Sequence, residues 1–189
     1  MQKSKIVIIT APSGSGKTTL VKQLLNTLPE LSFSVSACTR KPRKGEVHGK
    51  DYYFFDEQKF KELIATDAFA EWEMVYEGKY YGTLKEELER IWKEAHTPLV
   101  DIDVKGALAI KQTYPKNSLS IFIQAPSINI LRTRLKNRGT ETEKSLAERI
   151  AKANYELGFA NRFDTILVND DLETATQMLL KIVEEYLQS

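Results

Sequence analysis

Short apolar runs recur along the chain and alternate with segments of helical periodicity. Residues 5–10 form an uninterrupted run rich in β-branched side chains, which is typical of a strand buried on both faces of a parallel sheet. Further runs of this kind lie at 99–102, 120–123 and 165–168. Strands separated by helices predict an α/β fold with a central parallel sheet flanked by helices.

The segments between these runs carry apolar residues at spacings of three and four, as amphipathic helices do. Helices are expected at residues 17–28, 104–113, 127–137, 145–159 and 171–187. Another should follow Thr83, and the spacing of Thr83 and Glu86 is that of a capping box at its start. These helices would supply the crossovers that parallel strands require.

Two segments do not fit this alternation. Residues 34–83 contain a charged loop with proline and glycine and two further strand-like runs, which together predict a small inserted subdomain. Trp72 lies within the second run and is expected in the core. Residues 136–150 are polar and carry several cationic side chains, and we expect them to form a mobile lid. The core of a single domain would then comprise residues 1–33, 84–135 and 151–189.

Composition excludes several classes of function. The formal net charge of +1 gives no reason to propose nucleic acid or an acidic membrane as a partner. A single cysteine, Cys38, cannot form an intrachain disulfide, and His48 and His96 alone cannot build a zinc cluster. No apolar stretch suits a secretory signal or a membrane span, so we expect a cytoplasmic protein.

The eight residues APSGSGKT follow the first predicted strand and open a helix, which is the context of a phosphate-binding loop. The glycines let backbone N–H groups point inward around a polyphosphate, Lys17 would meet the β- and γ-phosphates, and Thr18 would bind Mg²⁺. A Gly/Ser turn with a solvated Lys17 is the alternative, but the length and context of the pattern favour nucleotide binding. The predicted ATP-binding residues are Ala11, Pro12, Ser13, Gly14, Ser15, Gly16, Lys17 and Thr18.

A basic loop and two tyrosines follow in residues 40–53, and they suit a monophosphate because arginine offers bidentate donors and tyrosine a directional hydroxyl. A basic loop by itself is more often a solvated surface. Tyr53 and Tyr80 are expected to pack rather than to bind ligand. Asp101 and Asp103 are two apart at the carboxyl end of a predicted strand, where α/β proteins bind their ligands.

The segment SACTRKPRKGEVHGKDYYF, residues 36–54, closely resembles the signature of the guanylate kinase family. Cys38 replaces the usual hydroxyl residue of that signature. The resemblance continues through FAEWEMVYEGKYYGT, LVDIDVKGA, RLKNRGTETEKSLAERI and VNDDL, and so covers essentially the whole chain. It implies a P-loop kinase that transfers the γ-phosphate of ATP to GMP, and also to dGMP, with Mg²⁺ as cofactor, in purine nucleotide metabolism and GMP recycling.

The resemblance also implies roles for residues at matching positions. Ser36, Glu71 and Thr83 would contact guanine, and arginines and tyrosines would hold the GMP phosphate. The implied GMP-binding residues are Ser36, Arg40, Arg43, Glu46, Tyr52, Glu71, Tyr81, Thr83 and Asp101. The implied catalytic residues are Lys17, Arg134, Arg138 and Arg149. Asn169 would approach the adenine, and Asp103 would act on Mg²⁺ indirectly.

Several of these residues have a second interpretation. Thr83 and Asp103 could each cap a helix, Arg134 could lie on the surface, and Glu71 could be solvated on an exposed strand face. Two other functions also remain: a guanylate-kinase-like interaction module without activity, and a kinase for AMP or dTMP. The sequence leaves open whether the protein is a monomer or a homodimer.

Overall fold

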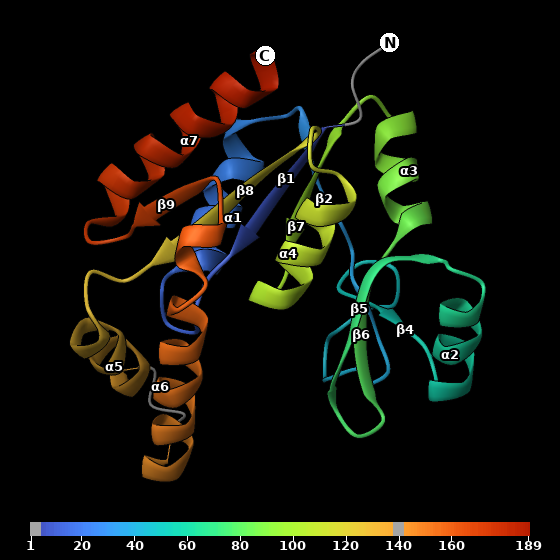
Figure 1. Cartoon of the computed structure of the whole chain (residues 1–189), viewed down its shortest axis with the longest axis horizontal. Helices are drawn as coiled ribbons and strands as arrows, with labels where there is room; N and C mark the ends of the chain where they lie inside the picture. Colours follow the sequence, from blue (N-terminus) through green and yellow to red (C-terminus); the bar gives the residue numbers. More distant parts are fainter. Residues whose placement is uncertain (1–4, 138–141) are drawn as a thin grey trace.

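A parallel sheet of five strands lies at the centre of the molecule (Figure 1). A computed structural model describes residues 5–137 and 142–189. The strands lie in the order β2-β7-β1-β8-β9 and all neighbouring pairs are parallel. Their bounds are β1 Ile6–Thr10, β2 Leu31–Phe33, β7 Thr97–Asp101, β8 Ser118–Gln124 and β9 Thr165–Val168. The predicted α/β fold with a central parallel sheet is therefore confirmed.

Helices cover both faces of this sheet (Figure 1). Helices α1 (Lys17–Thr27) and α7 (Leu172–Gln188) pack in one apolar cluster with Val7 and Ile9, and α3 (Lys85–Lys93) and α4 (Val104–Thr113) pack in another with Ile6 and Ile8. Successive side chains of β1 therefore enter opposite layers, which explains why the run has no polar alternation. Each such aliphatic side chain contributes about 1.5–3 kcal/mol by its burial.

A second, smaller sheet forms a separate lobe, at the right of Figure 1. Its strands lie in the order β4-β3-β6-β5, and α2 packs on it through the buried Phe60, whose ring stacks 4.4 Å from that of Phe69. The elements are β3 Ala37–Cys38, β4 Tyr53–Phe54, α2 Glu57–Ala65, β5 Phe69–Tyr76 and β6 Lys79–Leu84. They occupy the segment expected to form an inserted subdomain, with β6 running one residue beyond it.

Two further helices form an arm beside the main sheet (Figure 1). Helix α5 (Ile128–Asn137) and helix α6 (Glu143–Leu157) share a small apolar cluster, and a short 3₁₀ helix, Ala160–Arg162, leads into β9. Thr142 and Ser145 cap α6 reciprocally, so that helix begins before the expected position 145. The expected lid falls on the end of α5, the first half of α6 and residues 138–141, which include Arg138 and lie outside the described part of the chain.

Two expectations from the sequence are wrong. The helix after Thr83 has Leu84 as its N-cap with no side-chain cap, because the Thr83 hydroxyl bonds elsewhere, so the capping box with Glu86 does not form. Trp72 is 46% exposed and not in the core, because strand alternation turns it away from the cleft that its neighbours Glu71 and Glu73 line.

No helix within residues 5–137 and 142–189 is long and apolar enough to cross a membrane.

Candidate active site

A cleft of about 1120 Å³ lies at the carboxyl ends of β1 and β7. Residues of the main sheet, the smaller sheet and α6 all line it. Ligands of open parallel sheets bind in this position. Pockets for one small ligand commonly enclose ~300–1,000 Å³, so this cleft is larger than the upper end of that range.

The loop between β1 and α1 forms the floor of the cleft, with residues 11–18 all lining it. Gly14 and Gly16 have positive φ angles of 93° and 90°, which side chains other than glycine rarely adopt. Asn169 supports the loop from behind, because its side-chain amide donates to the Ser15 carbonyl at 2.8 Å. A Cβ atom on Gly16 would lie 2.2 Å from that amide nitrogen, so the loop requires glycine there.

The first residue of α1 pairs with the last residue of β7. The Lys17 ammonium donates to a carboxylate oxygen of Asp101, and both side chains are partly exposed to the cleft. Strand register explains the contact, since Asp101 lies beside Ile9, two residues before the loop begins at Ala11. Asp103 also lines the cleft, but it accepts a hydrogen bond from the Gly106 N–H at 2.9 Å and is the N-cap of α4, as its alternative interpretation predicted.

The basic loop is organised by one acidic residue. Arg40 donates to both carboxylate oxygens of Glu46 at 2.5 and 2.7 Å, and the Arg43 N–H donates to the same carboxylate at 2.7 Å. These bonds, the Arg40 bond foremost, lower the pKa of Glu46 to about 2. The Arg40 guanidinium also lies 4.7 Å from the centre of the Tyr52 ring, and this ring forms a T-shaped pair with that of Tyr81. Glu46, Tyr52 and Tyr81 line the cleft.

Glu71 lies on the cleft side of β5 and is only partly exposed. Thr83, directly opposite on β6, is fully buried and its hydroxyl donates to Glu71 at 2.8 Å. Burial raises the pKa of Glu71 to about 7, the negative charge of Asp103 adds to this, and the Thr83 bond partly opposes it. A Cβ atom at Gly106 would come within 2.7 Å of the carboxylate. The two alternative interpretations are therefore wrong: Glu71 is not solvated on an exposed strand face, and Thr83 does not cap the following helix.

Helix α6 contributes a polar stripe that the sequence analysis missed apart from Arg149. The residues of this stripe recur at helical spacing and line the cleft: Ser145, Glu148, Arg149, Lys152 and Glu156. The Arg149 guanidinium donates to the Ser13 hydroxyl at 2.8 Å, which joins the arm to the phosphate loop. Helical periodicity in the sequence could have revealed this stripe, because the apolar residues Leu146, Ile150 and Ala153 recur on the opposite, buried face of the helix.

Other sequence-predicted residues lie beside the cleft rather than on its surface. Arg134 donates to the backbone carbonyls of Asn169 and Asp170 at 3.0 and 3.2 Å, and Asn169 itself is buried behind the loop. Ser36 and Asp101 do line the cleft. Arg40 and Arg43 do not line it, but the Arg40 side chain and the Arg43 backbone N–H donate to Glu46, which does. Within the described residues, the structure thus brings together the loop, the carboxylates and the tyrosines.

The oxygen donors at this site suit Mg²⁺. Thr18 presents an exposed hydroxyl in the first turn of α1, and the carboxylates of Asp101 and Asp103 face the same cleft. No group of three His, Cys, Asp or Glu side chains positioned to hold a metal occurs among residues 5–137 and 142–189. Mg²⁺ in kinases commonly takes one or two protein oxygens and completes its shell with water and substrate phosphates, which this donor set can support.

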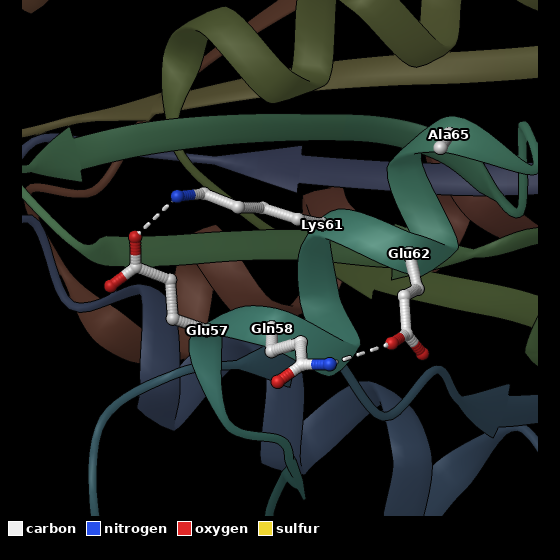
Figure 2. A pocket seen from close by; sticks show the side chains of 5 residues that line it. All are labelled: Glu57, Gln58, Lys61, Glu62 and Ala65. Atoms are coloured by element: carbon white, nitrogen blue, oxygen red, sulfur yellow. Dashed lines mark hydrogen bonds and ion pairs between the residues drawn. The ribbon is translucent and has the colours of Figure 1, made fainter.

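A second hollow lies on the outer surface of α2 (Figure 2). Its charged and polar groups bond to one another, Lys61 to Glu57 at 2.7 Å and Gln58 to Glu62 at 3.3 Å. It shares no residue with the cleft described above. Because these side chains already bond to one another, we do not consider this hollow a binding site.

A phosphate loop at the carboxyl end of a central parallel strand, facing a second lobe across one cleft, defines a P-loop kinase for a small substrate. The family described as Guanylate kinase matches residues 3–186. The chain therefore belongs to the guanylate kinase family, whose reaction is transfer of the γ-phosphate of ATP to GMP.

Individual relatives agree with this membership. A guanylate kinase of Bacteroides fragilis is 45% identical over 98% of this chain and 91% of its own length, and that of Porphyromonas gingivalis is 44% identical over 97% and 98%. The crystal structure of guanylate kinase from Anaplasma phagocytophilum superposes with a TM-score of 0.78 at 28% identity, covering 100% of this chain and 89% of that one. A shikimate kinase from Bacteroides thetaiotaomicron shares the fold alone, at 16% identity and a TM-score of 0.52.

Proposed function

We propose that this chain transfers the γ-phosphate of ATP to GMP within the single cleft, with ATP on the phosphate loop and GMP on the smaller sheet. The observation that carries the proposal is that one cleft is lined both by Lys17 of the loop and by the partly buried Glu71 of β5. Phosphoryl transfer requires the donor and the acceptor to be held in line, with little covalent chemistry left to the protein.

On the ATP side, the N–H groups of the loop and the N-terminus of α1 would bind the phosphates, and Lys17 would neutralise charge on the group in transit. Thr18, with Asp101 or Asp103 directly or through water, would hold Mg²⁺. When bound, the ion would offset phosphate charge. Asn169 would act from behind by fixing the loop through its bond to Ser15.

On the GMP side, Glu71 would accept from guanine N1–H and from the 2-amino group, while Ser36 would donate to O6. Thr83 would keep the carboxylate in place through its 2.8 Å bond. The Arg40, Arg43, Tyr52 and Tyr81 groups, assembled around Glu46, would then hold the phosphate of GMP. The two sets of groups would thereby contact opposite ends of the acceptor, the base and the phosphate, which favours one orientation.

Helix α6 would complete the site as part of the arm. Arg149, already bonded to Ser13 of the loop, and Arg138 would meet charge that develops on the phosphates, with Arg134 holding the carbonyls behind the loop. Closure of the arm over both nucleotides would exclude water, which otherwise competes with GMP as acceptor.

The experiment that tests this function compares acceptors. In a coupled assay for ADP formation, we expect rapid turnover with ATP and GMP and turnover lower by orders of magnitude with AMP or dTMP. Equal rates with AMP or dTMP would contradict the assignment of the acceptor. No ADP with any acceptor would favour the interaction module instead, although the retained geometry of Lys17 and Arg149 argues against that result.

A further inference from the structure

A buried carboxylate joins the two lobes of the molecule outside the cleft. Glu87, in the first turn of α3, has a side chain that is only 1% exposed. It accepts hydrogen bonds from the Val35 backbone N–H at 3.0 Å and from the Tyr53 hydroxyl at 2.9 Å. A charged side chain is seldom buried so fully unless it is paired and hydrogen-bonded. The positions of its partners therefore show what this carboxylate holds together.

The partners of Glu87 lie on different parts of the chain. Val35 is in the connection from β2 to β3, where the chain leaves the main sheet for the smaller one, and Tyr53 is on β4 of the smaller sheet. Helix α3 itself begins where β6 returns the chain to the main sheet. Glu87, which lies at the second connection between the lobes, therefore bonds to the first connection and to the smaller sheet.

The same helix supplies the countercharge. Arg90 donates to both carboxylate oxygens of Glu87 at 2.9 Å. Burial alone would raise the pKa of Glu87, but the bonds from Arg90, Val35 and Tyr53 outweigh it and hold the pKa below its ordinary value. Glu87 is consequently ionised at neutral pH and accepts four charge-assisted bonds, stronger than those of neutral groups.

Two of the three partners of Glu87, Val35 and Tyr53, adjoin the acceptor site. Val35 precedes Ser36 and Tyr53 follows Tyr52, and the Tyr53 N–H donates to the Ser36 carbonyl at 2.9 Å. Ser36 and Tyr52 line the cleft, whereas Glu87 is not among its lining residues. Fixing Val35 and Tyr53 thus fixes the backbone that carries two groups facing the acceptor.

We infer that Glu87 is a positioning residue for GMP, a buried pivot that holds the smaller lobe and its ligand groups at the angle that acceptor binding needs. This inference rests on the proposed function. The apparent Kd of a ligand rises in inverse proportion to the fraction of protein molecules that have the competent arrangement. Loosening the pivot spreads the lobe over more orientations, which lowers that fraction for GMP and leaves the ATP loop unaffected.

The test measures binding of GMP and of a non-hydrolysable ATP analogue by calorimetry, without turnover. In Glu87→Gln the amide NH₂ must face an Arg90 donor whichever way it turns, and in Tyr53→Phe a single bond to the smaller lobe is lost. We expect each change to raise the Kd of GMP, about tenfold for Glu87→Gln, with the Kd of the ATP analogue unchanged. Glu89→Gln, an exposed change on the same helix, is the matched control and should bind both ligands as the wild type does.

The two variants should also be coupled, so that the double variant weakens GMP binding little more than Glu87→Gln alone. Lower melting temperatures with unchanged GMP affinity would make Glu87 merely structural and overturn the inference. Tighter GMP binding would also overturn it, since Glu87 would then hold the lobe away from the competent angle. Failure of the wild type to bind GMP would instead contradict the proposed function. If Glu87→Gln does not fold, the Tyr53→Phe variant still tests the inference.

Discussion

Replacing Lys17 with alanine should lower kcat at least about a hundredfold while the fold stays intact. The side chain lines the cleft and belongs to none of the apolar clusters of the described residues, so its loss removes charge from the site and not packing from the core. Removing one group that stabilises charge in a transition state commonly costs ~2.7–4 kcal/mol. Steady-state kinetics with ATP and GMP, together with a thermal melt, measure the two effects separately.

The matched control is Lys22→Ala. Lys22 is an exposed cation on the same helix and does not line the cleft, so this variant should keep wild-type kinetics. A Lys17→Ala enzyme as active as the control would show that the loop does not hold the transferring phosphate.

Replacing Glu71 with glutamine should reduce GMP activity steeply and shrink the preference for GMP over AMP. A carboxylate accepts from both donors of guanine, whereas the amide presents a donor to one of them. Adenine has no proton on N1 and no 2-amino group, so the wild-type carboxylate would lose both bonds with AMP. A site built around such bonds can reject the analogue by ~10⁴-fold or more. The ratio of kcat/KM values for the two acceptors measures the effect.

Glu62→Gln, an exposed change on α2 of the same lobe, should leave that ratio unchanged. Wild-type discrimination by Glu71→Gln would mean that Glu71 does not read the base. The pH dependence gives an independent check, because the pKa of Glu71 is raised to about 7. Below that pH the free enzyme carries the protonated form, which accepts less well, so GMP affinity should fall as the pH drops and binding should release a proton. The glutamine variant should keep only the dependence that comes from the phosphate of GMP, whose second pKa is ~6.

The sequence predicts the framework of the site better than its chemistry. The β-branched run before the loop has no polar alternation because both faces of β1 are covered, and the loop pattern is local in sequence, so both could be predicted. The environment of Glu71 could not, since it depends on the pairing of β5 with β6 and on the approach of Gly106 from α4. The same pairing takes the Thr83 hydroxyl away from the helix it was expected to cap.

Misplaced residues have equally specific causes. Trp72 was expected in the core because it lies within a predicted strand, but β5 turns its acidic side chains toward the cleft, which leaves the indole on the outer surface. The contacts of Glu87 join segments far apart in the chain, and nothing in the residues around it marks a buried carboxylate. The helical periodicity of polar residues in the sequence would have been enough to predict the polar stripe of α6.

The ion pair between Lys17 and Asp101 should couple the binding of the two nucleotides, because Lys17 belongs to the phosphate loop and the family resemblance assigns Asp101 to the GMP site. The free enzyme neutralises each charge with the other, so a nucleotide that engages one partner must separate the pair and leaves the other partner available. The second nucleotide then binds without that cost, and such coupling is reciprocal by thermodynamic necessity. An ATP analogue should therefore lower the Kd of GMP by the same factor as GMP lowers that of the analogue, and independent Kd values would rule the linkage out. Heterotropic cooperativity of this kind populates the ternary complex at the expense of the half-filled states, in which the phosphate would be exposed to water without its acceptor.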